Sequence, residues 1–181
     1  RIVLVHLYPR EMSIYGDRGN TQALAGRIRR HGYEAEVLEH HPGDRFPGDA
    51  HLLMGGGGQD SGQARVEADL EVIGPTLRSM AAEGVPMLMI CGMYQLFGDS
   101  FRTVTGQVLD VTTSGNDKRM IGPVCLETEL GRVVGYENHS GSTVLGPGQQ
   151  AFGKVLAGYG NNGEDGTEGA RTGNVIGTYL H

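Results

Sequence analysis

The sequence predicts an α/β domain with a mostly parallel sheet, because short apolar segments alternate with segments of helical spacing through its first half. Residues 1–8 are rich in β-branched and aromatic side chains, which predicts a strand that Pro9 ends. Residues 66–83 place their apolar side chains on one helical face. The bulky, uncharged residues 86–90 are typical of a strand buried on both faces of a parallel sheet. Further elements are expected at 21–31 (a helix capped by Asn20 or Thr21), 34–38 and 51–54 (strands).

The second half of the chain is expected to be rich in β-strands. Short segments bounded by turn residues recur there at the spacing of roughly 8–12 residues that is typical of antiparallel sheets. They lie at 107–111, 124–128, 132–136, 154–159 and 174–180. The polar, glycine-rich residues 161–169 predict an exposed loop. We see no linker or internal repeat, so we expect one domain spanning residues 1–181, truncated after His181.

The composition favours a soluble, cytoplasmic protein. Lys and Arg total 15 against 21 Asp and Glu, the net charge is -6, and no basic block occurs, so we expect no nucleic-acid partner. No apolar run reaches membrane-spanning length and no basic-then-apolar leader opens the chain, so we expect no membrane insertion. Cys91 and Cys125 form no CxxC pair, which fits a reducing cytosol and predicts neither a disulfide scaffold nor a metal site. We expect no cofactor on this chain.

Cys91 is the first candidate for chemistry. It follows the predicted strand 86–90 and precedes the first turn of a predicted helix. A thiol at that join faces the carboxyl edge of the sheet, and the N–H groups of the helix favour the thiolate. Without that context, a lone cysteine is more often a small buried hydrophobic side chain, and we expect Cys125 to be one.

Three features fall at the ends of predicted strands, where ligands bind in α/β folds. They are the glycine run 55–58, Cys91 and His181. A cysteine nucleophile needs a base that takes and returns a proton, and N–H donors that hold an oxyanion. His181 could supply the base, and the amides of Gly57 and Gly92 could supply the oxyanion hole. The alternative, a nucleotide-binding loop at the glycine run, lacks a completed G-x-G-x-x-G or G-K-[ST] pattern.

Several short motifs occur in order along nearly the whole chain. They are YGDRGN at 15–20, MGGGGQD at 54–60, ICGMYQ at 90–95, GYENH at 135–139, GYGNN at 158–162 and GTYLH at 177–181. Together they resemble the class I glutamine amidotransferases of the cobyric acid synthase type. The resemblance implies a flavodoxin-like α/β fold and a glutaminase, which hydrolyses L-glutamine to glutamate and ammonia through a cysteine thioester.

The resemblance implies a role for each matching position. Cys91 would be the nucleophile, and His181 would be the base and then the acid that protonates the departing ammonia. Arg119 would bind the α-carboxylate of the substrate glutamine, which a planar guanidinium can hold with two parallel bonds. Gln95 would add a substrate contact, with packing of the helix as an equal alternative. Asp17 is the candidate for an accessory carboxylate near the histidine, with an exposed residue that caps the next helix as its equal alternative.

Two positions depart from the family pattern near the expected site. Met93 stands where glycine is usual and crowds a tight turn, although its side chain could point into the packing face of the helix. Ser61-Gly62 replaces a charged pair, which affects the substrate contacts expected from that loop. In addition, the family continues past His181, and we expect a chain that ends there to turn over poorly.

Within the family, the motifs most resemble the free-standing glutaminase subunits of lipid II isoglutaminyl synthases. That resemblance implies a heterodimer with a MurT-like synthetase subunit, which would bind ATP and Mg²⁺ and use the ammonia to amidate the D-glutamate α-carboxyl of lipid II in peptidoglycan synthesis. A glutaminase domain for cobyrinic or cobyric acid amidation is the alternative, although the phosphate loop of the usual fused ATP-binding half is absent. A non-catalytic interaction module on the same fold is a third interpretation.

Overall fold

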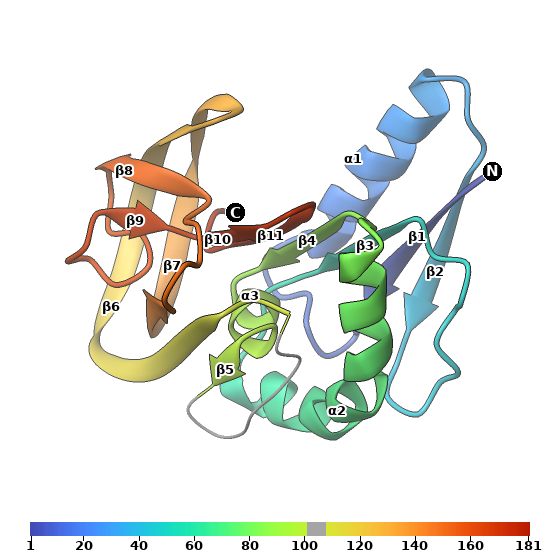
Figure 1. The fold of residues 1–181 in the computed structure, drawn as a ribbon, viewed down its shortest axis with the longest axis horizontal. Coiled ribbons are helices and arrows are strands. Elements are labelled where there is room, and N and C mark those ends of the chain that lie inside the picture. Colours follow the sequence, from blue (N-terminus) through green and yellow to red (C-terminus); the bar gives the residue numbers. More distant parts are fainter. Residues whose placement is uncertain (101–107) are drawn as a thin grey trace.

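The computed structural model describes residues 1–100 and 108–181 and places them in two sheets that lie side by side (Figure 1). Within the described residues, the first sheet has six strands in the order β10-β11-β4-β3-β1-β2. Its parallel members are β1 (Ile2–Leu7), β2 (Ala35–His40), β3 (Leu52–Gly55), β4 (Met87–Ile90) and β11 (Val175–Thr178), and β10 (Ala170–Thr172) pairs antiparallel at one edge. The predicted mostly parallel sheet is confirmed.

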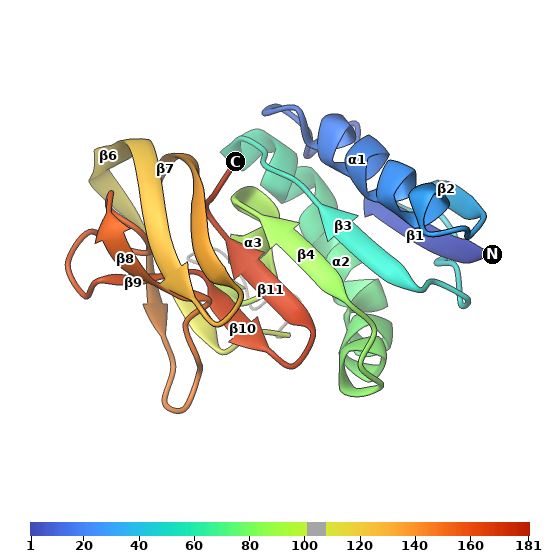
Figure 2. The ribbon, with the colours of Figure 1, turned by 90° about the horizontal axis from the view of Figure 1, so that it is seen from above.

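Helices cover both faces of this first sheet, and Figure 2 shows the layers from above. The described part of the chain holds three of them: α1 (Asp17–Arg30) on one face, and α2 (Asp60–Ala82) and α3 (Gly92–Leu96) on the other. The predicted cap of α1 at Asn20 or Thr21 is wrong, because Gly16, at a φ of 84°, already turns the chain into the helix. None of these described helices is both long and apolar enough to cross a membrane.

The first sheet carries the core and brings the candidate residues to one edge. Residues 3–7 of β1 and 53–55 of β3 are all buried, as expected for strands covered on both faces. β1, β3, β4 and β11 run parallel, so their carboxyl ends meet at the same edge. The glycine run 55–58, Cys91 and His181 all lie at or just beyond the strand ends on this edge.

The second sheet consists mainly of one long antiparallel hairpin. In this hairpin, β6 (Val111–Thr128) pairs with β7 (Gly131–Leu145). The sheet is extended by β8 (Gly153–Ala157) and β9 (Thr167–Glu168). In addition, β5 (Asp99–Ser100) pairs with β6 in parallel. The β-rich second half is thus confirmed. The predicted strands 124–128 and 132–136 are only the parts of the hairpin nearest its turn. Of the predicted strand 107–111, residue 107 lies outside the described residues and β6 begins at Val111.

The loop predicted to be exposed at 161–169 is exposed only in its middle. Asn161 and Glu168 are fully buried at its two ends. Asn161 holds the loop closed through paired hydrogen bonds with Gly169, at 2.9 and 3.0 Å. Glu168 accepts hydrogen bonds from the Tyr179 N–H at 2.6 Å and from the Thr178 hydroxyl at 2.9 Å. The loop therefore fixes the segment that leads from β11 to the candidate histidine.

Candidate active site

Cys91 lies on a strained turn between β4 and α3. Its φ of 53° and ψ of -107° place a non-glycine residue in a region that costs on the order of 1–3 kcal/mol. Its backbone N–H donates to the carbonyl of Thr178 at 2.8 Å, which ties the turn to β11. The following residue has little space, since a Cβ on Gly92 would lie 2.7 Å from the Met12 Cε. The turn thus holds the cysteine at the carboxyl edge of the sheet.

The structure brings His181 to the same place. A Cβ built on Gly57 would lie 3.4 Å from the Cys91 Cβ and 3.3 Å from the His181 Cε1, so the two residues flank this glycine. Two backbone hydrogen bonds with Tyr136, at 2.8 and 3.2 Å, hold His181, and the Tyr15 ring packs against the imidazole with the ring centroids 4.6 Å apart. Within the described residues, both ring nitrogens of His181 are buried without a hydrogen-bond partner.

Burial keeps both members of this pair uncharged. It raises the pKa of the Cys91 thiol to about 12, an effect that the Gly92 N–H opposes and the negative charge of Asp17 reinforces. Burial also lowers the pKa of His181, and the nearby His139 acts in the same direction. The predicted preference for a thiolate is therefore wrong for this structure, because desolvation of the buried thiol outweighs the hydrogen bond from the Gly92 N–H.

Gly57, the predicted oxyanion donor, is hydrogen bonded to Asp17 in this structure. Its N–H donates to the Asp17 Oδ2 at 3.1 Å. Asp17 is fully buried at the start of α1, so its interpretation as an exposed capping residue is wrong. Burial raises the pKa of this carboxyl group, and the Gly57 N–H opposes the rise. A Cβ on Gly56 would collide with the same carboxylate. Asp17 thus contacts the glycine run, whereas the nitrogens of His181 remain without a partner among the described residues.

A polar cavity of about 470 Å³ opens beside the thiol. Three predicted residues, Cys91, Gln95 and Arg119, line it. The Arg119 Nε donates to the Oδ1 of Asn138 at 2.7 Å, which holds the guanidinium against β7. Several other residues line the cavity and were not predicted site residues, among them Tyr15, Gln63, Asn138 and His139. Their positions in the motifs 15–20 and 135–139 were the available signal for three of them.

The short helix behind Cys91 is packed into the protein. The Gln95 Nε2 donates to the Tyr179 hydroxyl at 3.0 Å, and its Oε1 accepts from the Gln63 Nε2 at 2.6 Å. The amide of Gln95 is therefore committed to the cavity wall in this structure. Met93 is fully buried. A Cβ on Gly55 would lie 2.8 Å from the Met93 Cγ, so glycine at position 55 makes room for the methionine.

A comparison with protein families identifies the domain that carries this site. The profile of the CobB/CobQ-like glutamine amidotransferase domain matches residues 3–181. The chain belongs to this family. As a CobB/CobQ-like glutamine amidotransferase, it is a glutamine-hydrolysing enzyme.

Two relatives of this CobB/CobQ-like domain match nearly its whole length. The "Lipid II isoglutaminyl synthase (glutamine-hydrolyzing) subunit GatD" of Staphylococcus aureus is 34% identical over 99% of this chain and 76% of its own. The subunit of the same name from Streptococcus pneumoniae is 31% identical over 98% of this chain and 72% of its own. A cobyric acid synthase of Pelotomaculum thermopropionicum is 34% identical, but over only 58% of this chain and 24% of its own.

Solved structures agree on the fold of the CobB/CobQ-like domain. The structure of PurLQS from Thermotoga maritima superposes with a TM-score of 0.68 at 17% identity, covering 100% of this chain and 87% of the other. A glutamine amidotransferase from the same organism gives 0.65 at 13% identity, covering 99% and 75%. The predicted class I glutamine amidotransferase fold is confirmed.

Proposed function

We propose that this chain is GatD, the glutaminase subunit of a lipid II isoglutaminyl synthase. The observation that carries the chemistry is that Cys91 and His181 flank Gly57, and that Cys91 lines a polar cavity. Relatives named GatD match 99% and 98% of the chain, whereas the cobyric acid synthase matches 58%. This difference favours the GatD function over cobyrinic or cobyric acid amidation.

The first step joins sulfur to the amide carbon of glutamine. The Cys91 thiol gives its proton to the neutral imidazole of His181 as the sulfur attacks, and the amide oxygen becomes an oxyanion. The Gly92 N–H, which already acts on the thiol, is one donor for this oxyanion. The Gly57 N–H is proposed as the second donor, which requires it to leave the Asp17 Oδ2 to which it donates in this structure.

The second half of the reaction returns the proton and releases both products. His181 protonates the amide nitrogen, the carbon–nitrogen bond breaks, and ammonia leaves a glutamyl thioester on Cys91. Water then gives a proton to His181 as its oxygen attacks the thioester carbon, and the carbon–sulfur bond breaks. Glutamate departs, and the imidazole returns the proton to the thiolate.

Arg119 is proposed to orient the substrate. It lines the cavity beside Cys91, and its Nε is held by Asn138. A guanidinium forms strong, charge-assisted hydrogen bonds with a carboxylate, so Arg119 suits the α-carboxylate of glutamine. Gln95 lies on the same wall, where its hydrogen bonds to Tyr179 and Gln63 fix the shape of the cavity.

The ammonia is proposed to pass to a MurT-like synthetase subunit in a heterodimer. That subunit would bind ATP and Mg²⁺ and convert the D-glutamate α-carboxyl of lipid II to an amide, a step in peptidoglycan and cell-wall synthesis. The glutaminase chemistry uses only side chains and backbone amides, so this subunit requires no cofactor of its own. Because the amidation consumes ATP, we place the complex in the cytoplasm.

The test is glutamate release from L-glutamine, measured with and without the co-expressed synthetase subunit. Cys91→Ala is expected to abolish release, and Cys125→Ala, which removes the other thiol, is the matched control that retains it. Amidation of lipid II by the complex identifies the acceptor. With glutamine as the nitrogen source, Cys91→Ala should lose this amidation, and added ammonia should restore it. No glutamate release under either condition would refute the enzymatic proposal and favour a non-catalytic interaction module.

A further inference from the structure

Tyr15 lies against the candidate base and takes no part in the steps that make and break bonds. It belongs to the loop between β1 and α1 and lines the same cavity as Cys91. Its ring packs on the imidazole of His181, with the ring centroids 4.6 Å apart and the ring planes 51° apart. A Cβ on Gly57 would lie 2.8 Å from the Tyr15 Cδ2. The tyrosine, the histidine and the cysteine therefore meet around this glycine.

The loop holds Tyr15 in this position through the residues on either side of it. The backbone N–H of Ile14 donates to the carbonyl of Gly57 at 3.2 Å. Gly16, at a φ of 84°, turns the chain into α1 directly after the tyrosine. The buried carboxylate of Asp17 then accepts a hydrogen bond from the Gly57 N–H at 3.1 Å. Both backbone polar groups of the glycine are thus bound to the segment that carries the ring.

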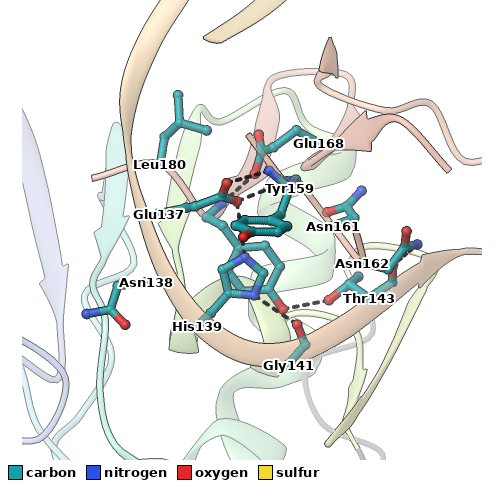
Figure 3. Close-up of polar contacts among 12 residues, drawn as sticks. Glu137, Asn138, His139, Gly141, Thr143, Tyr159, Asn161, Asn162, Glu168 and Leu180 are labelled. Atoms are coloured by element: carbon teal, nitrogen blue, oxygen red, sulfur yellow. Dashed lines mark hydrogen bonds and ion pairs between the residues drawn. The ribbon is translucent and has the colours of Figure 1, made fainter. Parts of the chain in front are cut away.

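His181 is fixed through its backbone, whereas its side chain has no hydrogen bond to hold it. Two backbone hydrogen bonds with Tyr136 hold the residue, and Glu168 fixes the segment that precedes it (Figure 3). In the part of the chain that the structure describes, both imidazole nitrogens are buried without a hydrogen-bond partner. The base of a nucleophile–base pair is ordinarily oriented by a third group. The Tyr15 ring has the position of such a group, because it packs directly on the imidazole.

The surroundings of His181 disfavour a positive charge on its imidazole. Burial lowers its pKa, and His139 on β7 acts in the same direction. Its other titratable neighbours are the Cys91 thiol, on the turn after β4, and Tyr15. The carboxylate of Asp17 is bound to the glycine N–H between them. The proton that leaves the thiol therefore needs an additional stabilising contact on the imidazole.

We propose that Tyr15 positions His181 and that its ring stabilises the imidazolium formed when Cys91 gives up its proton. The inference rests on the proposed role of His181 as the base. A cation over a tyrosine ring, within about 6 Å of its centroid, is attracted by the negative face of the ring, most strongly where water is excluded. The distance of 4.6 Å between the centroids lies within that limit. The contact is made by the ring, so phenylalanine can replace the tyrosine and an aliphatic side chain cannot.

The alternative is a ring that acts only by excluding water, and the pKa of His181 distinguishes the two roles. In Tyr15→Leu, loss of the attraction for the imidazolium lowers that pKa further. If the ring only excluded water, its loss would admit solvent to the imidazole and raise the pKa. Tyr15→Phe keeps the aromatic face and should recover the wild-type value. Tyr15 is 37% exposed, so we expect both variants to fold.

The first experiment is an NMR titration of the full-length chain labelled with ¹³C,¹⁵N-histidine, with the His181 signals assigned from a His181→Gln variant. We expect the pKa of His181 to fall by about one unit in Tyr15→Leu. Tyr33→Leu, the same substitution at an exposed tyrosine beyond α1, is the control that leaves it unchanged. In the wild-type chain, nuclear Overhauser contacts should join the ring protons of Tyr15 to the imidazole protons of His181, which tests the proposal even if a variant does not fold. Missing contacts, or an unchanged or raised pKa in Tyr15→Leu, would overturn it.

Turnover separates this inference from the proposed function. Glutamate release by the complex with the synthetase subunit, and its loss in Cys91→Ala, report on the glutaminase, whereas the NMR measurements need no turnover. If the release is confirmed, Tyr15→Leu should lower kcat by about tenfold with little change in KM, and Tyr15→Phe should recover most of the loss. Release with an unchanged kcat in Tyr15→Leu, or with a raised KM alone, would leave the glutaminase intact and refute the role of Tyr15 on the base.

Discussion

Glu168 offers a test of how the buried polar groups behind the site affect stability. The side chain is fully buried and joins the loop at 161–169 to Thr178 and Tyr179. Burial raises its pKa from 4.5 to about 7, while the hydrogen bonds from Tyr179 and Thr178 oppose the rise and the charge of Glu137 adds to it. Glu168→Gln replaces this group with a neutral amide that resembles the protonated acid.

The size and sign of the effect follow from that pKa. Since the folded-state value exceeds the unfolded one, the stabilisation by the protonated acid is fully present below pH 4.5 and is lost as the pH rises through about 7. The difference between the two values corresponds to about 3 kcal/mol. The amide of Glu168→Gln does not titrate. The stability of the wild type relative to the variant should therefore fall by about 3 kcal/mol between pH 4.5 and about pH 8.

Urea unfolding of both chains across that pH range measures the difference directly. Glu164→Gln, which removes an exposed carboxylate from the same loop, is the control and should show little pH-dependent difference from the wild type. A constant difference between wild type and Glu168→Gln would show that Glu168 keeps an ordinary pKa. A wild type that gains stability over the variant as the pH rises would reverse the sign and refute the reasoning.

Three further predictions concern the active site. Gly57→Ala should lower kcat/KM by about 100-fold without unfolding the chain, because the new Cβ would lie 2.8 Å from the Tyr15 ring and between the thiol and the imidazole. The control is Gly48→Ala, whose Cβ has no atom within 4 Å and whose kcat/KM should equal that of the wild type. Equal activities of the two variants would contradict the geometry. In a chain that lacks Cys125, Asp17→Asn should speed the alkylation of Cys91 by iodoacetamide at alkaline pH. The reason is that the charge of Asp17 raises the pKa of the Cys91 thiol in the wild type, and the variant removes that charge. Unchanged or slower alkylation would argue against this coupling. Arg119→Lys should raise KM for glutamine by about tenfold with little change in kcat, and an unchanged KM would exclude the carboxylate contact.

The sequence was sufficient for the order of the buried elements and for the turn that carries the cysteine. An unbroken apolar segment before Cys91 and a glycine directly after it specify a buried strand and a tight turn, and both occur. The sequence failed at the start of α1, where Gly16 begins the helix before the expected cap. It also gave the hairpin of β6 and β7 as short separate strands, because polar residues between Ser114 and Arg119 interrupt the alternating pattern while the pairing continues on both sides.

The site was predictable in its members but not in its electrostatics. The motifs supplied Cys91 and His181, and the structure places both beside Gly57. The partner of the Gly57 N–H depends on the burial of Asp17, which looks like a surface residue in its polar, glycine-punctuated segment. The neutral thiol likewise follows from desolvation, which depends on the packing of distant segments around the turn. A linear sequence carries no direct signal for either.

The central claim, that Cys91 is the nucleophile of a glutamine-specific site, is tested most directly by covalent labelling. The chain, together with its synthetase subunit, is treated with a glutamine analogue that carries a chloroketone in place of the side-chain amide, and the label is mapped by peptide mass spectrometry. The account predicts one label, on Cys91, which excess L-glutamine prevents and D-glutamine does not. A label on Cys125 instead, or labelling of Cys91 that glutamine does not prevent, would contradict it.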